Sequence, residues 1–221
     1  MSRPIRLPRP RAPVVVLALA VTAAVVMATA IALRGDADPP EPLRVAVVGD
    51  DYTAGTQNRV VWPTLVAERT GWSVSNFALP GAGFAADGRG GYAFTYQVDR
   101  ARGDDPDVIL VFGGLSDTGL PDAGPVEVGA AAVIDKAVLG GERLLFIGPT
   151  WYQAPVPDAV TRVSDAVLGV AESADIPFLG ALDPPWLTPD LMLPDLSGPT
   201  DAGQSVLADT ISAWVRAEVG R

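Results

Sequence analysis

The chain has 221 residues, 48% of them apolar, with a net charge of −10 at pH 7. This length suits one membrane segment and one domain, and the apolar fraction excludes a disordered chain. The absence of Cys and His excludes disulfides, thiolate or imidazole metal sites and a Ser-His-Asp triad, and the acidic excess excludes nucleic acid as a partner.

An Arg-rich tail and a long apolar segment precede the domain. Val14–Leu33 is an unbroken run of 20 uncharged residues, long enough to cross roughly 30 Å of hydrocarbon. Four Arg precede it, so the positive-inside rule predicts a cytoplasmic tail over 1–12, a single-pass transmembrane signal anchor over 13–34 and an extracytoplasmic domain. The alternative is a signal peptide cleaved at the small residues in 28–32, which would release a secreted domain. Residues 35–42 form a short Pro-rich linker.

Apolar runs and helical segments alternate over residues 43–221. The expected strands are Leu43–Val48, Ser73–Ala78, Asp107–Phe112, Arg143–Ile147 and Ile176–Leu179. The expected helices are Val60–Thr70, Pro125–Leu139, Asp158–Ala174 and Asp201–Val219. Near-continuous apolar strands separated by helices are typical of parallel sheets that are covered on both faces. The sequence therefore predicts an α/β fold with a doubly wound, flavodoxin-like parallel sheet of about five strands.

Polar residues follow the ends of the predicted strands, where ligands bind in such sheets. Asp50, Asp51, Asp117 and Asp195 all lie in these loops, and the fold would bring them together. Neighbouring carboxylates can share acid and base roles or hold Mg²⁺ or Ca²⁺. Since Gly and Asp are also common in turns, we expect no metal or cofactor from this pattern alone.

Four loops, taken in order, resemble sequence blocks of the SGNH (GDSL-type) esterases and lipases. Gly49–Gly55 (GDDYTAG) resembles that family's Gly-Asp-Ser-Tyr-Thr-Ala-Gly block, with Asp51 where the nucleophilic Ser belongs. Gly81 matches the Gly whose N–H belongs to the oxyanion hole. Gly113–Asp117 resembles the Gly-Gly-x-Asn-Asp block, with Ser116 in place of the oxyanion-hole Asn.

The fourth block lies before the last predicted helix. Asp195–Gly203 resembles the family's Asp-x-x-His-Pro-Thr-Asp-Ala-Gly block and keeps its Asp195. Gly198 stands at the position of the catalytic His, and Gln204 where a second His often follows. The resemblance covers roughly residues 43–217 and implies an SGNH-hydrolase fold for the whole exported domain.

The resemblance implies a hydrolase fold without its chemistry. The family's Ser attacks an ester, its His takes the proton, and its Asn and Gly stabilise the oxyanion. Of these groups only Gly81 remains, so we expect a pseudoenzyme that acts as an envelope binding or scaffold domain. The alternative is a hydrolase of ester, acyl or glycan substrates that uses a carboxylate-based site centred on Asp51.

The candidate ligand-binding residues are those that could still contact a molecule in the cleft. They are Asp50, Asp51, Asp117, Trp151 and Tyr152. The expected ligand is an envelope glycan or an acylated molecule, because aromatic rings can stack on sugars. Arg outnumbers Lys 15 to 1, a bias associated with GC-rich bacterial genomes. The expected location is therefore a bacterial cell membrane, and the acidic domain is expected to be a monomer.

Overall fold

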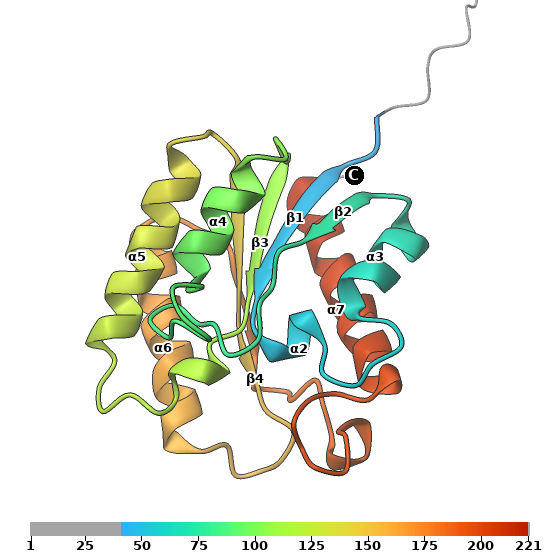
Figure 1. Cartoon of the computed structure of the whole chain (residues 1–221), viewed down its shortest axis with the longest axis vertical. Coiled ribbons are helices and arrows are strands. Elements are labelled where there is room, and N and C mark those ends of the chain that lie inside the picture. The colour runs from blue at the N-terminus through green and yellow to red at the C-terminus, as the bar shows by residue number, and fades with distance from the viewer. Residues whose placement is uncertain (1–40, 221) are drawn as a thin grey trace, which may run out of the picture. The chain divides into compact units, whose positions relative to one another are not determined.

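The computed structural model describes residues 41–220, which contain a five-stranded parallel sheet in the order β2-β1-β3-β4-β5 (Figure 1). The strands are β1 (Arg44–Gly49), β2 (Ser73–Asn76), β3 (Val108–Phe112), β4 (Arg143–Thr150) and β5 (Phe178–Ala181). All four neighbouring pairs are parallel. The predicted flavodoxin-like parallel sheet is therefore confirmed.

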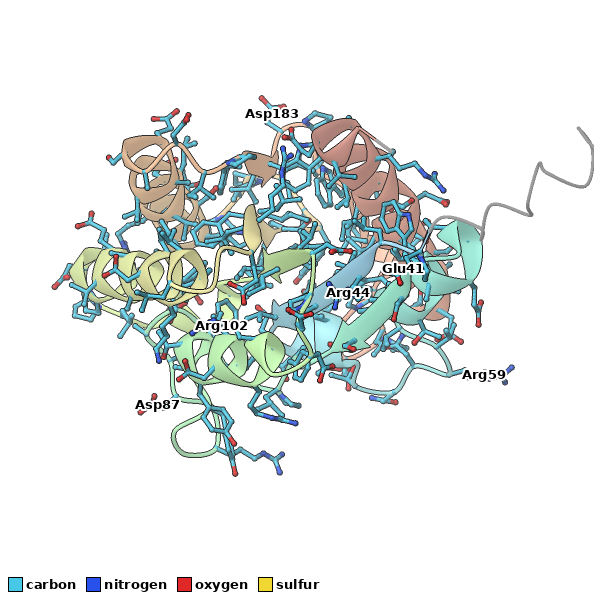
Figure 2. The ribbon with its side chains drawn as sticks, turned by 90° about the horizontal axis from the view of Figure 1, so that it is seen from above. Glu41, Arg44, Arg59, Asp87, Arg102 and Asp183 are labelled. Carbon is cyan, nitrogen blue, oxygen red and sulfur yellow. The ribbon has the colours of Figure 1, made fainter. Side chains whose placement is uncertain are left out.

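Helices cover both faces of this sheet (Figures 1 and 2). The α-helices are α2 (Asp51–Ala54), α3 (Trp62–Thr70), α4 (Phe94–Arg102), α5 (Gly124–Val138), α6 (Asp158–Ser173) and α7 (Asp201–Val219), and the 3-10 helices are η1 (Leu115–Asp117) and η2 (Pro189–Leu191). Helices α4, α5 and α6 pack on one face, and α3 and α7 pack on the other. This arrangement is the doubly wound architecture that the alternating strands and helices predict.

The strands are apolar on both sides because both faces are buried. Along β3, Ile109 and Val111 join the core beneath α4, α5 and α6, whereas Leu110 and Phe112 join the core beneath α3 and α7. Alternate side chains of a strand point to opposite faces, so one apolar run contributes to two cores.

The structure contains two α-helices that the sequence reading missed. Helix α4 (Phe94–Arg102) has a mostly polar sequence, and it buries only one face through Phe94, Val98 and Ala101. Helix α2 has four residues, too few to show a helical period. Strand β4 also continues to Thr150, beyond its expected end at Ile147, because its last residues remain buried beside β5.

The predicted membrane anchor over 13–34 and the cytoplasmic tail over 1–12 lie outside the described residues, as does most of the linker over 35–42. Within residues 41–220, no helix combines the length and the apolar character that a bilayer crossing requires.

Candidate functional site

A small cavity of about 210 Å³ lies at the carboxyl end of the sheet, where three loops meet. Its lining residues are Asp50, Asp51, Tyr52, Leu115, Ser116 and Ser197. The first three of these residues follow β1, the next two follow β3, and Ser197 precedes α7. Strands β1 and β3 are the neighbours at which the strand order reverses, the point where doubly wound folds bind ligands. The cavity therefore occupies the position that the fold favours for a site.

Asp51 begins helix α2, and its carboxylate contacts the loop after β2. Its Oδ2 atom accepts a hydrogen bond from the N–H of Gly81 at 2.8 Å. Gly81 has a φ of 74°, a left-handed conformation that a residue with a side chain rarely adopts, and this turn directs its N–H to the carboxylate. Asp51 thus lies within hydrogen-bond distance of the backbone donor that the family resemblance assigns to the oxyanion hole.

Asp50 is the N-cap of α2 and is almost fully buried. One carboxylate oxygen accepts from the N–H of Tyr52 and the other from the N–H of Gly114, each at 3.2 Å. Burial raises the pKa of Asp50 to about 7, a shift that the Tyr52 N–H opposes and the nearby Asp51 carboxylate reinforces. Both oxygens are used within the fold, so Asp50 joins the loops after β1 and β3.

Asp117, also a candidate ligand-binding residue, is not among the residues that line the cavity. Its side chain is completely buried and accepts three backbone N–H groups, from Phe84 at 2.8 Å, Ala85 at 3.0 Å and Ala86 at 2.8 Å. Burial raises the pKa of this carboxyl, and the three N–H donors oppose the shift. Asp117 therefore holds the segment that follows Gly81 against the sheet.

The loop before α7 brings a residue into the cavity that the sequence reading missed. Ser197 lines the cavity, and its hydroxyl donates to Asp195 at 2.7 Å. The hydrogen bond from the Ser197 hydroxyl is the main cause of the lowered pKa of Asp195. The side-chain amide of Gln57 donates a further hydrogen bond to Asp195 at 3.1 Å. Asp195 itself is exposed and does not line the cavity. A side chain at Gly198 would meet the Thr56 hydroxyl at 3.0 Å, so Thr56 would have to move slightly to admit one.

Gln204 is fully buried and links α7 to the segment after β1. Its side-chain oxygen accepts from the N–H of Trp62 at 2.8 Å, and its amide donates to the carbonyl of Tyr52 at 3.0 Å. The residue that stands where the family often has a second His thus satisfies two backbone groups of the fold.

Trp151 and Tyr152 directly follow β4, so they lie at the carboxyl end of the sheet, as the cavity does. Their rings stack with centroids 4.8 Å apart and an interplanar angle of 29°. Tyr152 packs against the apolar core cluster that contains Tyr52, a residue that lines the cavity. Burial raises the pKa of Tyr52, with smaller contributions from Asp50, Tyr152 and Asp51. Both rings are partly exposed and can present a surface beside the cleft.

The four aspartates singled out from the sequence do not form one cluster. Only Asp50 and Asp51 line the cavity. In the part of the chain from 41 to 220, no three acidic side chains lie close enough to hold a metal ion. No Arg or Lys lines this cavity either, so its charge is negative.

Comparisons with known proteins identify relatives of this chain. A family model for GDSL-like lipases and acylhydrolases matches residues 47–206. A GDSL lipase of Mycobacterium tuberculosis is 30% identical over 191 residues, which cover 79% of this chain and 82% of that protein.

Solved structures share the fold at low identity. A psychrotrophic esterase from a Pseudoalteromonas species has a TM-score of 0.64 and 17% identity, and the match covers 80% of this chain and 98% of the esterase. A family two carbohydrate esterase from Clostridium thermocellum, solved in complex with cellohexaose, has a TM-score of 0.66 and 14% identity, with coverage of 82% and 66%. At these identities the likeness establishes the fold alone.

Proposed function

Because this chain belongs to the GDSL-like lipase and acylhydrolase family yet has other residues at the family's reactive positions, we propose that its cleft binds a ligand without hydrolysing esters. One observation carries the proposal. The carboxylate of Asp51 accepts the Gly81 N–H at 2.8 Å, so the donor needed by an ester oxyanion already has an anionic partner.

The missing catalytic groups strengthen this argument. The sequence contains no His that could take a proton from a nucleophile, and Asp51 and Ser116 replace the family's Ser and Asn. Loss of a triad member costs hydrolases on the order of 10⁴–10⁶ in turnover, and loss of one oxyanion donor costs about 10²–10³. These losses are large enough to bring ester hydrolysis down to the rate in buffer.

The location belongs to the same proposal. The 20 uncharged residues of Val14–Leu33 and the four preceding Arg support a single-pass anchor with the domain outside a bacterial membrane. The chain should then stay in the membrane pellet after an alkaline carbonate wash, and external protease should digest residues 43–221 in spheroplasts. Release of the chain into the medium would support the cleaved signal peptide instead.

Hydrolysis of p-nitrophenyl acetate by the full-length chain tests the proposed loss of activity. The expected rate equals the buffer background for the wild type and for Asp51→Ala. A rate above background that Asp51→Ala abolishes would contradict the proposal and favour the carboxylate-based hydrolase. That alternative is supported by Asp51, which lines the cavity and has a second oxygen without a hydrogen-bond partner among the described residues.

A restored variant provides the positive control for the assay. The combined substitutions Asp51→Ser, Ser116→Asn and Gly198→His return the family's reactive groups, and the Cβ added at Gly198 would lie 3.0 Å from the Thr56 hydroxyl. We expect this variant to hydrolyse the ester faster than the wild type. Equal background rates in both proteins would mean that features beyond these three positions also prevent catalysis.

A further inference from the structure

The cavity presents hydrogen-bonding groups that the fold leaves unused. Among residues 41–220, neither the Oδ1 atom of Asp51 nor the hydroxyl of Ser116 has a hydrogen-bond partner. The hydroxyl of Ser197 donates to Asp195, so its lone pairs remain able to accept. The unused groups are thus mainly acceptors, with one hydroxyl that can both donate and accept. Such a set is complementary to a ligand rich in hydroxyl groups.

The size and charge of the cavity exclude an acylated molecule, the other ligand class expected from the sequence. The volume of about 210 Å³ is below the roughly 300–1,000 Å³ of pockets for drug-sized ligands, so it suits one small ring. Only Leu115 and the ring of Tyr52 offer apolar surface, too little to cover an acyl chain. No basic side chain lines the cavity to neutralise a carboxylate or phosphate, and Asp51 would repel either one.

The stacked rings of Trp151 and Tyr152 lie at the same end of the sheet as the cavity, directly after β4. Their centroids are 4.8 Å apart, and they follow β4, the strand beside β3. Aromatic rings with an apolar face and a polar edge suit ligands that are apolar on one side and polar, and therefore hydrated, on the other. A sugar ring has these properties, because its C–H groups form a face and its hydroxyls form an edge.

We propose that the cleft binds a neutral sugar unit of a glycan, with sugar hydroxyls donating to Asp51 and accepting from Ser116, and with an adjoining unit against Trp151. This inference rests on the proposed non-hydrolytic function of the same cleft. It assigns Asp51 a role in ligand selection, because its carboxylate favours hydroxyl donors and rejects anions.

Saturation-transfer NMR on the full-length chain, kept in a detergent without sugar headgroups, tests the proposal. The neutral probes are cellotetraose and N-acetylated chitotetraose, the anionic acyl probe is octanoate, and the cationic probe is deacetylated chitotetraose. We expect at least one neutral probe to bind and octanoate not to bind. Asp51→Asn and Ser116→Ala should each weaken binding roughly 10-fold or more. With the amide oxygen of the Asn on the Gly81 N–H, its NH2 replaces the acceptor that faces the ligand with a donor, and Ser116→Ala removes the hydroxyl.

Two further variants separate the cleft from other aromatic surfaces. Trp151→Ala should weaken binding, whereas Tyr92→Ala should leave it unchanged. Tyr92 is an exposed ring, 40% accessible, that packs at a tilt against Tyr96 and does not line the cavity. Circular dichroism and melting curves confirm that each variant is folded.

The other outcomes overturn the inference in recognisable ways. Failure of both neutral probes to bind, or binding that Asp51→Asn and Ser116→Ala leave unchanged, would refute the sugar site. Binding of octanoate alone would refute it while leaving a non-hydrolytic binding domain intact. Preference for the deacetylated probe would mean that Asp51 selects a cation. Ester hydrolysis, measured separately, bears only on the proposed function.

Discussion

Asp117 stabilises the fold through three hydrogen bonds that its substitution by Ala would remove together. The N–H groups of Phe84, Ala85 and Ala86 donate to its buried carboxylate over 2.8, 3.0 and 2.8 Å. Hydrogen bonds to a charged group contribute about 1.5–3 kcal/mol each, and burial of the carboxylate offsets several kcal/mol of that sum. We therefore expect Asp117→Ala to lower the free energy of unfolding by about 3–5 kcal/mol and the Tm by about 10 °C.

Urea unfolding followed by circular dichroism measures this loss, and two variants in the contacting segment serve as comparisons. Asp87→Ala removes an exposed carboxylate from the same segment (Figure 2), so its effect should stay within about 0.5 kcal/mol. Gly83→Ala places a methyl group 2.5 Å from the Asp117 carboxylate and should destabilise the protein by displacing it. A loss below about 1 kcal/mol for Asp117→Ala, together with an unaffected Gly83→Ala, would refute the reasoning.

Two other buried side chains, Asp50 and Gln204, give further predictions about stability. Burial raises the pKa of Asp50 from an unfolded value of about 3.9 to about 7, so the folded state keeps a proton that the unfolded state loses. The contribution of Asp50 to the free energy of unfolding is therefore fully present below about pH 4. It declines by about 1.4 kcal/mol per pH unit as the pH rises to about 7. Asp50→Asn should remove this part of the slope in urea midpoints from pH 4 to 7, and an unchanged slope would contradict the assignment. Gln204→Ala leaves two buried backbone groups without partners and should cost about 2–4 kcal/mol in urea unfolding, whereas a loss below about 0.5 kcal/mol would show that water replaces both bonds.

Local patterns in the sequence correctly predicted several elements of the fold. The run Asp107–Phe112 predicted a buried strand, observed as β3, and the helix expected over Val60–Thr70 ends at Thr70, as α3 does. The sequence reading missed α4, a nine-residue helix with a mostly polar sequence. Its buried apolar residues Phe94, Val98 and Ala101 recur at the spacing of an amphipathic helix, so this repeat is the signal that could have revealed it.

The sequence by itself determined the doubly wound fold class, because strand patterning is readable without contacts. The resemblance of short blocks predicted that Asp51, Ser116 and Gly198 stand at the family's reactive positions. The sequence could not decide what each carboxylate contacts. Asp51 and Gly81 are 30 residues apart, and only the arrangement of β1 and β2 brings them within 2.8 Å. The tertiary structure likewise directed Asp117 inward and Ser197 into the cavity. Hydrogen-bond partners distant in sequence are set by packing and sheet order, and residue type alone does not encode them.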